Sequence, residues 1–416
     1  MPVVTSAKVA WALSVLYSGA LRATVVIAAA WIALRLLRGA SAAARSAVCA
    51  AALVALATLQ LLRGVPLGWA AEIPAAVAGP FATLGAVGIA SSAAAAGAHY
   101  ESLGRVSEEL VTTYPRVLAA LLALWAAGAA AVLLALGRGA VAARRIAARS
   151  APVHDAGWLR LLGEARAALG VRRPVRLLRD AAPWTPLTWG VRRPVIVLPA
   201  AADGWPEAHR RAVLLHELAH VGAGDALARV LARFACAALW FHPGAWWLAR
   251  RHRAERELAC DDRVLGAGVR ASDYAECLLR VADTLCPAGP ARAVAAAALG
   301  ASPLKRRVAA VLDPARSRRP LARRRAAAVL ALGVLLGVPL GTARLLPDRG
   351  AAEGMLRHPR WETRAYGIAV LATIGDRASV ASIARAVRSD PSGWVRMRAG
   401  EASTKLRARR RRRLDP

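Results

Sequence analysis

The chain has 416 residues and carries 58 lysines and arginines against 26 acidic residues, a formal net charge of +32, yet 57% of it is hydrophobic and its mean hydropathy is +0.38. This hydrophobicity excludes disorder for most of the chain, and its glycines lack the period of a collagen-like fibre. High charge combined with high hydropathy is typical of apolar membrane segments that alternate with basic loops and soluble parts.

Cysteine usage indicates a reducing compartment for the middle of the chain. The five cysteines include no CxxC pair, and four of them lie between positions 236 and 286. We therefore expect free thiols rather than a disulfide framework or a cysteine-based zinc site.

Four apolar runs are long enough to cross a membrane. Three of them lie in the N-terminal part and the fourth follows a cluster of arginines; they are Leu16–Leu37, Ser46–Leu62, Val117–Leu136 and Ala326–Leu346. The stretch Ala75–Ala98 is apolar mainly through alanine and glycine, so we predict an outer loop or an interfacial segment there.

Basic residues favour one orientation of these spans. Arginines concentrate in the first connection and after the third span, whereas the loop between the second and third spans adds four glutamates to its three arginines. The positive-inside rule thus predicts a multi-pass protein of the cell membrane with an external N-terminus, a cytosolic region 138–325 and an external C-terminus.

Residues 150–325 have the composition of a soluble domain, with frequent charges and turns rich in proline and tryptophan. The run Pro194–Pro199 is β-branched and bounded by prolines, which predicts a strand at a sheet edge that could pair with an extended substrate. Thr185–Gly190 before it is expected to form a turn or a partner strand. From Pro206 onward the pattern is helical, with the proline in the first turn.

The helix after Pro206 contains an HExxH motif formed by His216, Glu217 and His220. Residues four apart share one helix face, so the two imidazoles can bind one ion, and imidazole suits zinc. Glu217, next to the first ligand, can take a proton from water and return it to the leaving amine. This pattern predicts a zinc metallopeptidase, with Glu217 as the catalytic base.

The third protein ligand has to come from further along the chain. Position 226 is alanine, which excludes the third histidine of a metzincin. Glu257 and Asp261 are again four residues apart on a predicted helix, so Glu257 is the favoured ligand and Asp261 can accept a hydrogen bond from a ligand imidazole. His242 and Glu255 remain alternatives for the third ligand.

The region after the fourth span changes character again. The segment from Leu356 to Ala365 resembles the segment from Val387 to Arg396 at an offset of about 32 residues, and Ile368–Ile374 and Val380–Val387 are predicted helical cores. This pattern resembles HEAT repeats, which are stacked helix pairs. The arginine-rich end, Arg407–Arg413, is predicted to be a disordered basic tail.

The motif residues together resemble the BlaR/MecR-type membrane metallopeptidases. The resemblance is carried by His216–Val221, by the Leu-Trp-Phe-His-Pro segment Leu239–Pro243 and by Ala254–Leu265, with weaker likeness around Thr188–Gly190 and Leu304–Arg307. It implies a gluzincin with Glu257 as third ligand and Asp261 four residues later. It further implies three spans, a cytosolic zinc protease domain, a fourth span and an external module, with cleavage of itself and of a cytosolic transcriptional repressor after an external signal.

The sequence departs from that pattern after residue 346, where it lacks the Ser-x-x-Lys motif of a penicillin-binding domain. A β-lactam signal is therefore in doubt, and the external HEAT-like repeats are expected to bind a protein or peptide.

The expected fold is mainly α: multi-pass membrane helices, an inserted α+β zincin-like protease domain and a small helical HEAT-like domain. The predicted parts are a membrane region, a cytosolic protease domain, a fourth membrane helix, HEAT-like repeats and a basic tail, at residues 1–149, 150–325, 326–346, 347–406 and 407–416.

The expected function is that of a zinc endopeptidase of the membrane, a signal transducer whose protein substrate could be a winged-helix repressor and whose other partner is the lipid bilayer. Two other readings stay open: a quality-control protease, and a receptor or scaffold that has lost activity. Direct binding of nucleic acid is not expected, because the arginines flank spans and cover helix faces without a recognition motif.

Overall fold

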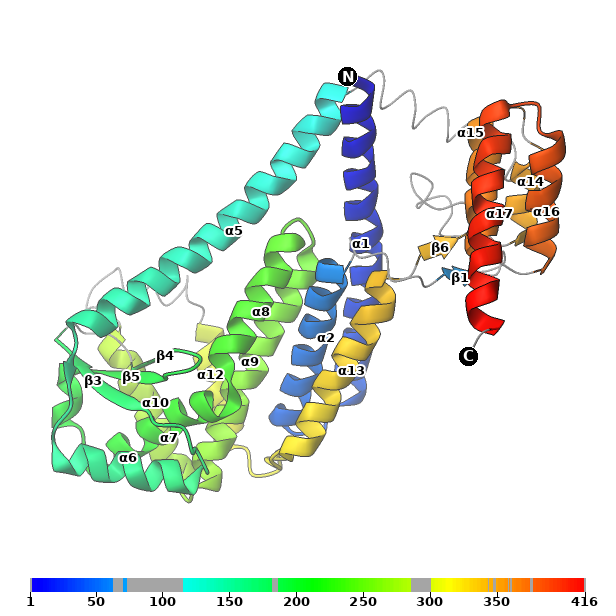
Figure 1. The fold of residues 1–416 in the computed structure, drawn as a ribbon. Helices are drawn as coiled ribbons and strands as arrows, with labels where there is room; N and C mark the ends of the chain where they lie inside the picture. The colour runs from blue at the N-terminus through cyan, green and yellow to red at the C-terminus, as the bar shows by residue number, and fades with distance from the viewer. Residues whose placement is uncertain are drawn as a thin grey trace. The chain divides into compact units, whose positions relative to one another are not determined.

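The computed structural model describes residues 2–62, 70–72, 115–181, 186–285, 301–342, 344–346, 349–357, 359, 361–374 and 377–414. The chain divides into two compact units, one formed by residues 23–60 and 126–338 and the other by residues 1–22, 61–125 and 339–416. The unit built on residues 126–338 contains the HExxH motif and is described first (Figure 1).

Three described helices are long and apolar enough to cross a membrane. They are α1 (Pro2–Leu36), α2 (Ala42–Leu62) and α5 (Pro115–Arg149), with candidate spans Gly19–Leu36, Ala42–Leu62 and Ala119–Arg149. The first three predicted spans are thus confirmed as candidate membrane helices. The stretch Ala75–Ala98 lies outside the described residues.

The fourth predicted span coincides with helix α13, but it ends earlier than expected. Helix α13 covers Arg323–Thr342, and residues Arg344–Leu346 instead form strand β6, which pairs in parallel with β1 (Ala70–Glu72). The fourth run is therefore a helix, and its role as a membrane span stays a prediction.

Small residues bring α13 and α2 into close contact. A methyl group added at Gly337 would lie 2.8 Å from the carbonyl oxygen of Ala55, and one at Gly333 would overlap with the backbone of Ala51. Two glycines four residues apart on one helix allow this approach, which is a common way for membrane helices to pack. In Figure 1 the two helices, yellow and blue, run side by side.

The soluble part of this unit is built on a four-stranded mixed sheet in the order β2-β3-β5-β4. Its strands are β2 (Ala151–Pro152), β3 (Arg176–Asp180), β4 (Leu187–Trp189) and β5 (Val195–Pro199). Strand β5 pairs in parallel with β3 and antiparallel with β4, and all five of its residues are buried.

This topology corrects the edge-strand prediction. The prolines that suggested an edge stand next to the start of β5 and at its last position. The residues between them keep their N–H groups, and Val195, Ile196 and Val197 pair on both sides. The partner strand expected within Thr185–Gly190 is confirmed as β4, and it is β4 that ends the sheet order on that side.

Helices cover the sheet and carry the site. They are α6 (Ala156–Ala168), the 3₁₀ turn η1 (Ala200–Gly204), α7 (Glu207–Ala223), α8 (Asp225–Ala238), α9 (Pro243–Gly266), α10 (Ala271–Leu285) and α12 (Ala301–Leu312). Their shared core contains Trp158, Ile196, Leu214, Leu218 and Tyr274, all 2% exposed or less. The motif helix α7 is thus buried along one face and held against α6, α9 and β4.

The described C-terminal residues form four helices with a core of their own. They are α14 (Arg349–Met355), α15 (Trp361–Ile374), α16 (Arg377–Ser389) and α17 (Gly393–Leu414). Ile368, Leu371, Ile383 and Val395 are almost completely buried in this core, which confirms the two predicted helical cores. Whether these helices are HEAT repeats stays a prediction.

The prediction of a disordered basic tail is wrong. Helix α17 continues through the arginine run to Leu414. Arginine has a high helix propensity, so a helix that is already anchored by Val395 and Leu406 continues into the arginine run. Free thiols are confirmed for the described cysteines, Cys49, Cys236, Cys260 and Cys277, all of which are buried. Cys286 lies outside the described residues.

Candidate metal site

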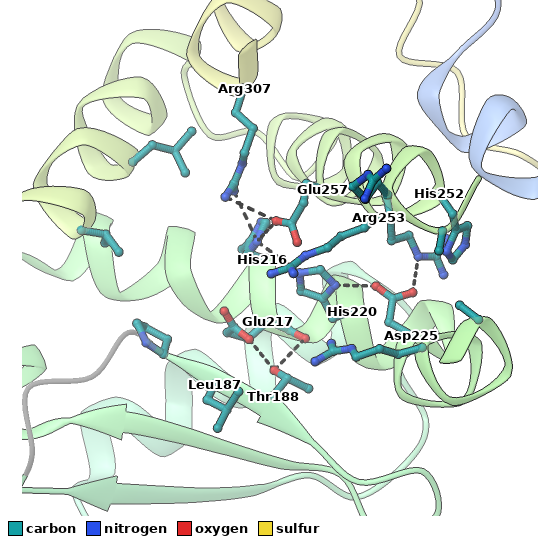
Figure 2. Close-up of a pocket in the computed structure, with 18 of the residues that line it drawn as sticks. Leu187, Thr188, His216, Glu217, His220, Asp225, His252, Arg253, Glu257 and Arg307 are labelled. Carbon is teal, nitrogen blue, oxygen red and sulfur yellow. Dashed lines mark hydrogen bonds and ion pairs between the residues drawn. The ribbon is translucent and has the colours of Figure 1, made fainter. Parts of the chain in front are cut away.

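The two histidines of the motif point at one place from adjacent turns of α7. Nε2 of His216 and Nε2 of His220 are 3.3 Å apart, and their rings are nearly perpendicular, at 89°. Helix α9 brings Glu257 to the same place, with its Oε2 3.7 Å from Nε2 of His216 (Figure 2). Ligand atoms of His216, His220 and Glu257 all lie within 4.8 Å of one another, which makes them a candidate metal site.

The second ring nitrogen of each histidine is bound to a buried carboxylate. Nδ1 of His216 lies 3.2 Å from Oδ1 of Asp261, and Nδ1 of His220 is hydrogen-bonded to Asp225. Such pairs fix the tautomer and orientation of metal-binding imidazoles. Because both Nδ1 atoms are engaged in this way, both Nε2 atoms face the shared point, where Nη2 of Arg307 also lies 3.3 Å from Nε2 of His216.

Further side chains hold these carboxylates. The Tyr274 hydroxyl donates to Oδ1 of Asp261 over 2.7 Å, and Arg307 donates to both oxygens of Asp261 over 2.7 and 2.9 Å. On the other side, Arg256 forms an ion pair with Asp225 and donates to the carbonyl oxygen of Ala223 over 2.7 Å. Each buried carboxylate is therefore matched by an arginine.

The electrostatics of the cluster keep its carboxylates ionised. Burial acts against the charged form, but the hydrogen bond from His216 and the charges of His216 and Arg307 lower the pKa of Glu257 to about 2. Burial and Arg307 act against protonation of His216, yet its hydrogen bonds with Asp261 and Glu257 raise its pKa to about 9. The cluster therefore attracts one positive charge, a proton or a cation, to the point between these residues.

Glu217 lies beside this cluster and faces the sheet. It is 8% exposed, and its carboxylate accepts a hydrogen bond from the hydroxyl of Thr188 on β4. A cavity of about 620 Å³ reaches Glu217, both histidines, Glu257 and Thr188. The carboxylate is thus mostly buried, is oriented by a hydroxyl, and lines the same cavity as the metal ligands (Figure 2).

A second group of possible ligands, His220, Asp225 and Cys260, overlaps the first. It would use Nδ1 of His220, which is bound to Asp225, and burial raises the pKa of the Cys260 thiol well above its usual range. Cys260 does not line the cavity, whereas the three residues of the first group do. The first group is therefore the one that fits a metal open to a substrate.

The two alternatives for the third ligand lie elsewhere. His242 is at the start of α9, where its Nδ1 accepts from the N–H of Gly244 over 3.1 Å and its Nε2 lies 3.0 Å from the hydroxyl of Thr24. Glu255 is completely buried among three arginines, Arg45, Arg251 and Arg306. Of the three carboxyl and imidazole candidates for third ligand, the structure brings only Glu257 to the histidines.

The roles of four residues at the site are visible only in the structure; these are Asp225, Tyr274, Arg307 and Thr188. Asp225 follows His220 by five residues across the helix break at Gly224. This short sequence separation was a signal that the two side chains could lie close together. Tyr274 and Arg307 are 58 and 91 residues from His216, and no spacing rule connects them to the motif.

Comparison with known proteins agrees with this geometry. The profile of the BlaR1 peptidase M56 family matches residues 14–311. The chain belongs to this family. A relative is the protein named Regulatory protein BlaR1 from Bacillus licheniformis, 30% identical over 146 residues, which make up 35% of this chain and 24% of the relative. The match thus spans about a quarter of that protein.

Membership in the M56 family confirms the resemblance seen in the sequence, and the family match covers both the candidate membrane helices and the metal cluster. It ends at residue 311, before α13 and the C-terminal helices. The family match therefore includes all three residues of the metal cluster, and α13 and the C-terminal helices lie beyond it.

Proposed function

We propose that this protein is a zinc-dependent endopeptidase of the membrane that hydrolyses peptide bonds at the His216–His220–Glu257 cluster. The observation that carries the proposal is this cluster itself, with ligand atoms within 4.8 Å of one another and with Glu217 on the helix of the two histidines. Two imidazoles and one carboxylate are the ligand set of a catalytic zinc site that keeps one position free.

The residues present fit a zinc ion. Both imidazoles have their Nδ1 fixed by carboxylates, and the cluster lies at the wall of a cavity rather than in a closed core. His216, His220 and Glu257 would hold the ion. When bound, zinc polarises a carbonyl oxygen and lowers the pKa of water.

Glu217 is the proposed general base. Its carboxylate takes a proton from the attacking water and delivers that proton to the nitrogen of the leaving amine. The hydrogen bond from Thr188 holds one carboxylate oxygen and leaves the other free for this transfer. Arg307 balances the charges of Asp261 and Glu257, since its Nη1 lies 3.3 Å from Oε2 of Glu257.

Strand β4 is the proposed guide for the substrate backbone. Pro186, Leu187 and Thr188 line the cavity, and β4 stands at the end of the sheet order. An extended peptide that pairs with this strand would pass Glu217. This role replaces the one first predicted for Pro194–Pro199, which lies inside the sheet.

The biological role proposed here is signal transduction by proteolysis. The M56 family and the regulatory name of the Bacillus relative support a signal transducer that cleaves a cytosolic transcriptional repressor and itself. We place the protease domain in the cytosol, the C-terminal helices outside, and a protein or peptide ligand on those helices.

Glu217→Gln in the full-length protein tests the proposed chemistry. The variant keeps shape and ligands, so it should retain zinc at the wild-type stoichiometry and lose cleavage of itself and of cellular proteins. Peptide termini compared between cells with wild type and variant would reveal the substrates: one repressor supports transduction, and many misfolded membrane proteins support quality control. Equal cleavage by both forms, or absence of zinc in the wild type, would overturn the proposal.

A further inference from the structure

A charge-free segment joins helices α8 and α9. Residues 234–249 read Phe-Ala-Cys-Ala-Ala-Leu-Trp-Phe-His-Pro-Gly-Ala-Trp-Trp-Leu-Ala and contain no Lys, Arg, Asp or Glu. Arg233 precedes the segment and Arg250 follows it. The two helices contact each other and run side by side in Figure 1, so the segment is the tip of a helical hairpin. We refer to residues 234–249 as the hairpin tip.

The hairpin tip contacts two of the candidate membrane helices. His242 is bonded to Thr24, and a methyl group added at Gly244 would lie 3.1 Å from Cγ2 of Ile27; Thr24 and Ile27 belong to the candidate span Gly19–Leu36. A side chain at Gly128, within the candidate span of α5, would overlap with the indole of Trp240. The tip therefore lies beside residues that are themselves inside predicted bilayer segments.

The polar side-chain groups of His242 and Trp246 in the tip have partners within the protein. Nδ1 of His242 accepts from Gly244, so a neutral ring carries its proton on Nε2 and donates it to Thr24. The indole N–H of Trp246 donates to the carbonyl oxygen of Trp240 over 2.8 Å. Polar groups satisfied in this way suit a medium without water, where an unpaired polar group is strongly unfavourable.

Large apolar side chains of the tip remain uncovered by protein. Phe234 and Phe241 are 51% and 44% exposed. The helical parts of the tip are residues 234–238 of α8 and 243–249 of α9. At about 1.5 Å per residue they are about 8 and 11 Å long, which is less than half of a bilayer core of about 30 Å. The arginines at the base of the arms, Arg229, Arg233, Arg250 and Arg253, would then stand at the level of the lipid headgroups. Among the described residues Arg229, Arg250 and Arg253 form no ion pair with an acidic side chain.

We propose that the hairpin tip inserts into one leaflet of the bilayer and returns on the same side, with Phe234 and Phe241 among the acyl chains. The arginines at the base of the hairpin bind anionic headgroups. Because these arginines also line the cavity of the metal site, its mouth opens at the membrane surface. The insertion itself requires no proteolysis, so it can be tested apart from the proposed function.

Photo-crosslinking of the full-length protein in vesicles of phosphatidylethanolamine and phosphatidylglycerol tests the insertion. Benzoylphenylalanine replaces Phe241 or Phe234, and adducts with acyl chains are measured by mass spectrometry. Two matched positions calibrate the result: Leu134, 66% exposed on the candidate span of α5, and Leu159, 46% exposed on α6 of the soluble part.

We expect lipid adducts at Phe241 and Phe234 within a factor of about three of those at Leu134, and at least about ten times those at Leu159. Yields at both phenylalanines equal to that at Leu159 would overturn the proposal. A crosslinked band at twice the mass of the chain, in place of lipid adducts, would assign the tip to a second copy and would overturn it as well. Circular dichroism and a single symmetric peak in size-exclusion chromatography report whether each variant has folded, independently of zinc.

Discussion

Two glutamates on helix α9 stand two residues apart and have opposite surroundings. Glu255 is completely buried and bound by Arg45 of α2, Arg251 of its own helix and Arg306 of α12. The side chain of Glu257 is 27% exposed and faces two histidines and a cavity. Glu255 thus joins α9 to other elements, whereas Glu257 offers a metal ligand. The difference comes from the side chains that face each glutamate, arginines in the first case and histidines in the second.

Among the changes that test this contrast, the largest effect is expected from Glu255→Gln, on the free energy of unfolding. Glu255→Gln leaves three arginines facing a buried neutral amide, and loss of one partner of a buried ion pair costs about 3–5 kcal/mol. Unfolding in detergent should show this loss, while the folded fraction keeps zinc at the wild-type stoichiometry. A variant that folds normally but lacks zinc would show that Glu255, not Glu257, is the ligand.

The next effect concerns the carboxylates behind the histidines. Asp225→Asn keeps the shape of the side chain but weakens its hold on Nδ1 of His220, and such a change typically costs about 10–100-fold in metal affinity. Zinc titration against a competing chelator at constant pH measures it. Asp203→Asn, at a half-exposed position whose partner is Arg179, serves as the control and should leave zinc affinity unchanged.

A smaller effect is expected at Thr188. Thr188→Val removes the hydroxyl that donates to Glu217 and preserves the β-branched shape, and a hydrogen bond to a charged group contributes about 1.5–3 kcal/mol. We expect kcat to fall by about 10–100-fold with unchanged zinc content, and Thr188→Ser to restore most of the activity. Zinc loss in the valine variant would contradict a role limited to Glu217.

The smallest effect is a pH dependence of stability that comes from His252, also on α9. Burial and the charge of Arg256 lower its pKa to about 4, whereas the unfolded chain takes up the proton near pH 6.5. Its contribution is therefore complete above pH 6.5 and is lost as the pH falls toward 4. Between pH 7 and 5.5 the free energy of unfolding should drop by about 1 kcal/mol more in the wild type than in His252→Gln. Equal slopes of stability against pH would contradict this.

The sequence predicted the parts of the site that follow helix periodicity. His216 with His220, and Glu257 with Asp261, are pairs four residues apart, and the structure joins both pairs at one point. Arg307 and Tyr274 could not be predicted, because only the packing of α10 and α12 against α7 and α9 brings them there. Local periodicity therefore identifies ligands, while the groups that hold and balance them depend on tertiary structure.

The fold shows the same division. Long apolar runs predicted three helices that meet the length and hydropathy of membrane spans, because this signal depends on composition alone. The edge assignment of Pro194–Pro199 was wrong because strand order depends on partners distant in sequence. The arginine run was read as disordered from its charge, although it continues the helix that begins at Gly393.

The ion pair between Arg45 and Glu255 has a mechanical consequence. Arg45 stands in the first turn of a candidate membrane helix, and Glu255 lies two residues before a ligand of the metal cluster on one continuous helix. Ala42 in the same turn of α2 packs against Leu258 and Ala259, which flank the same stretch of α9. The start of a candidate membrane helix is therefore fixed to the part of α9 that carries Glu257, by one buried ion pair and by apolar packing.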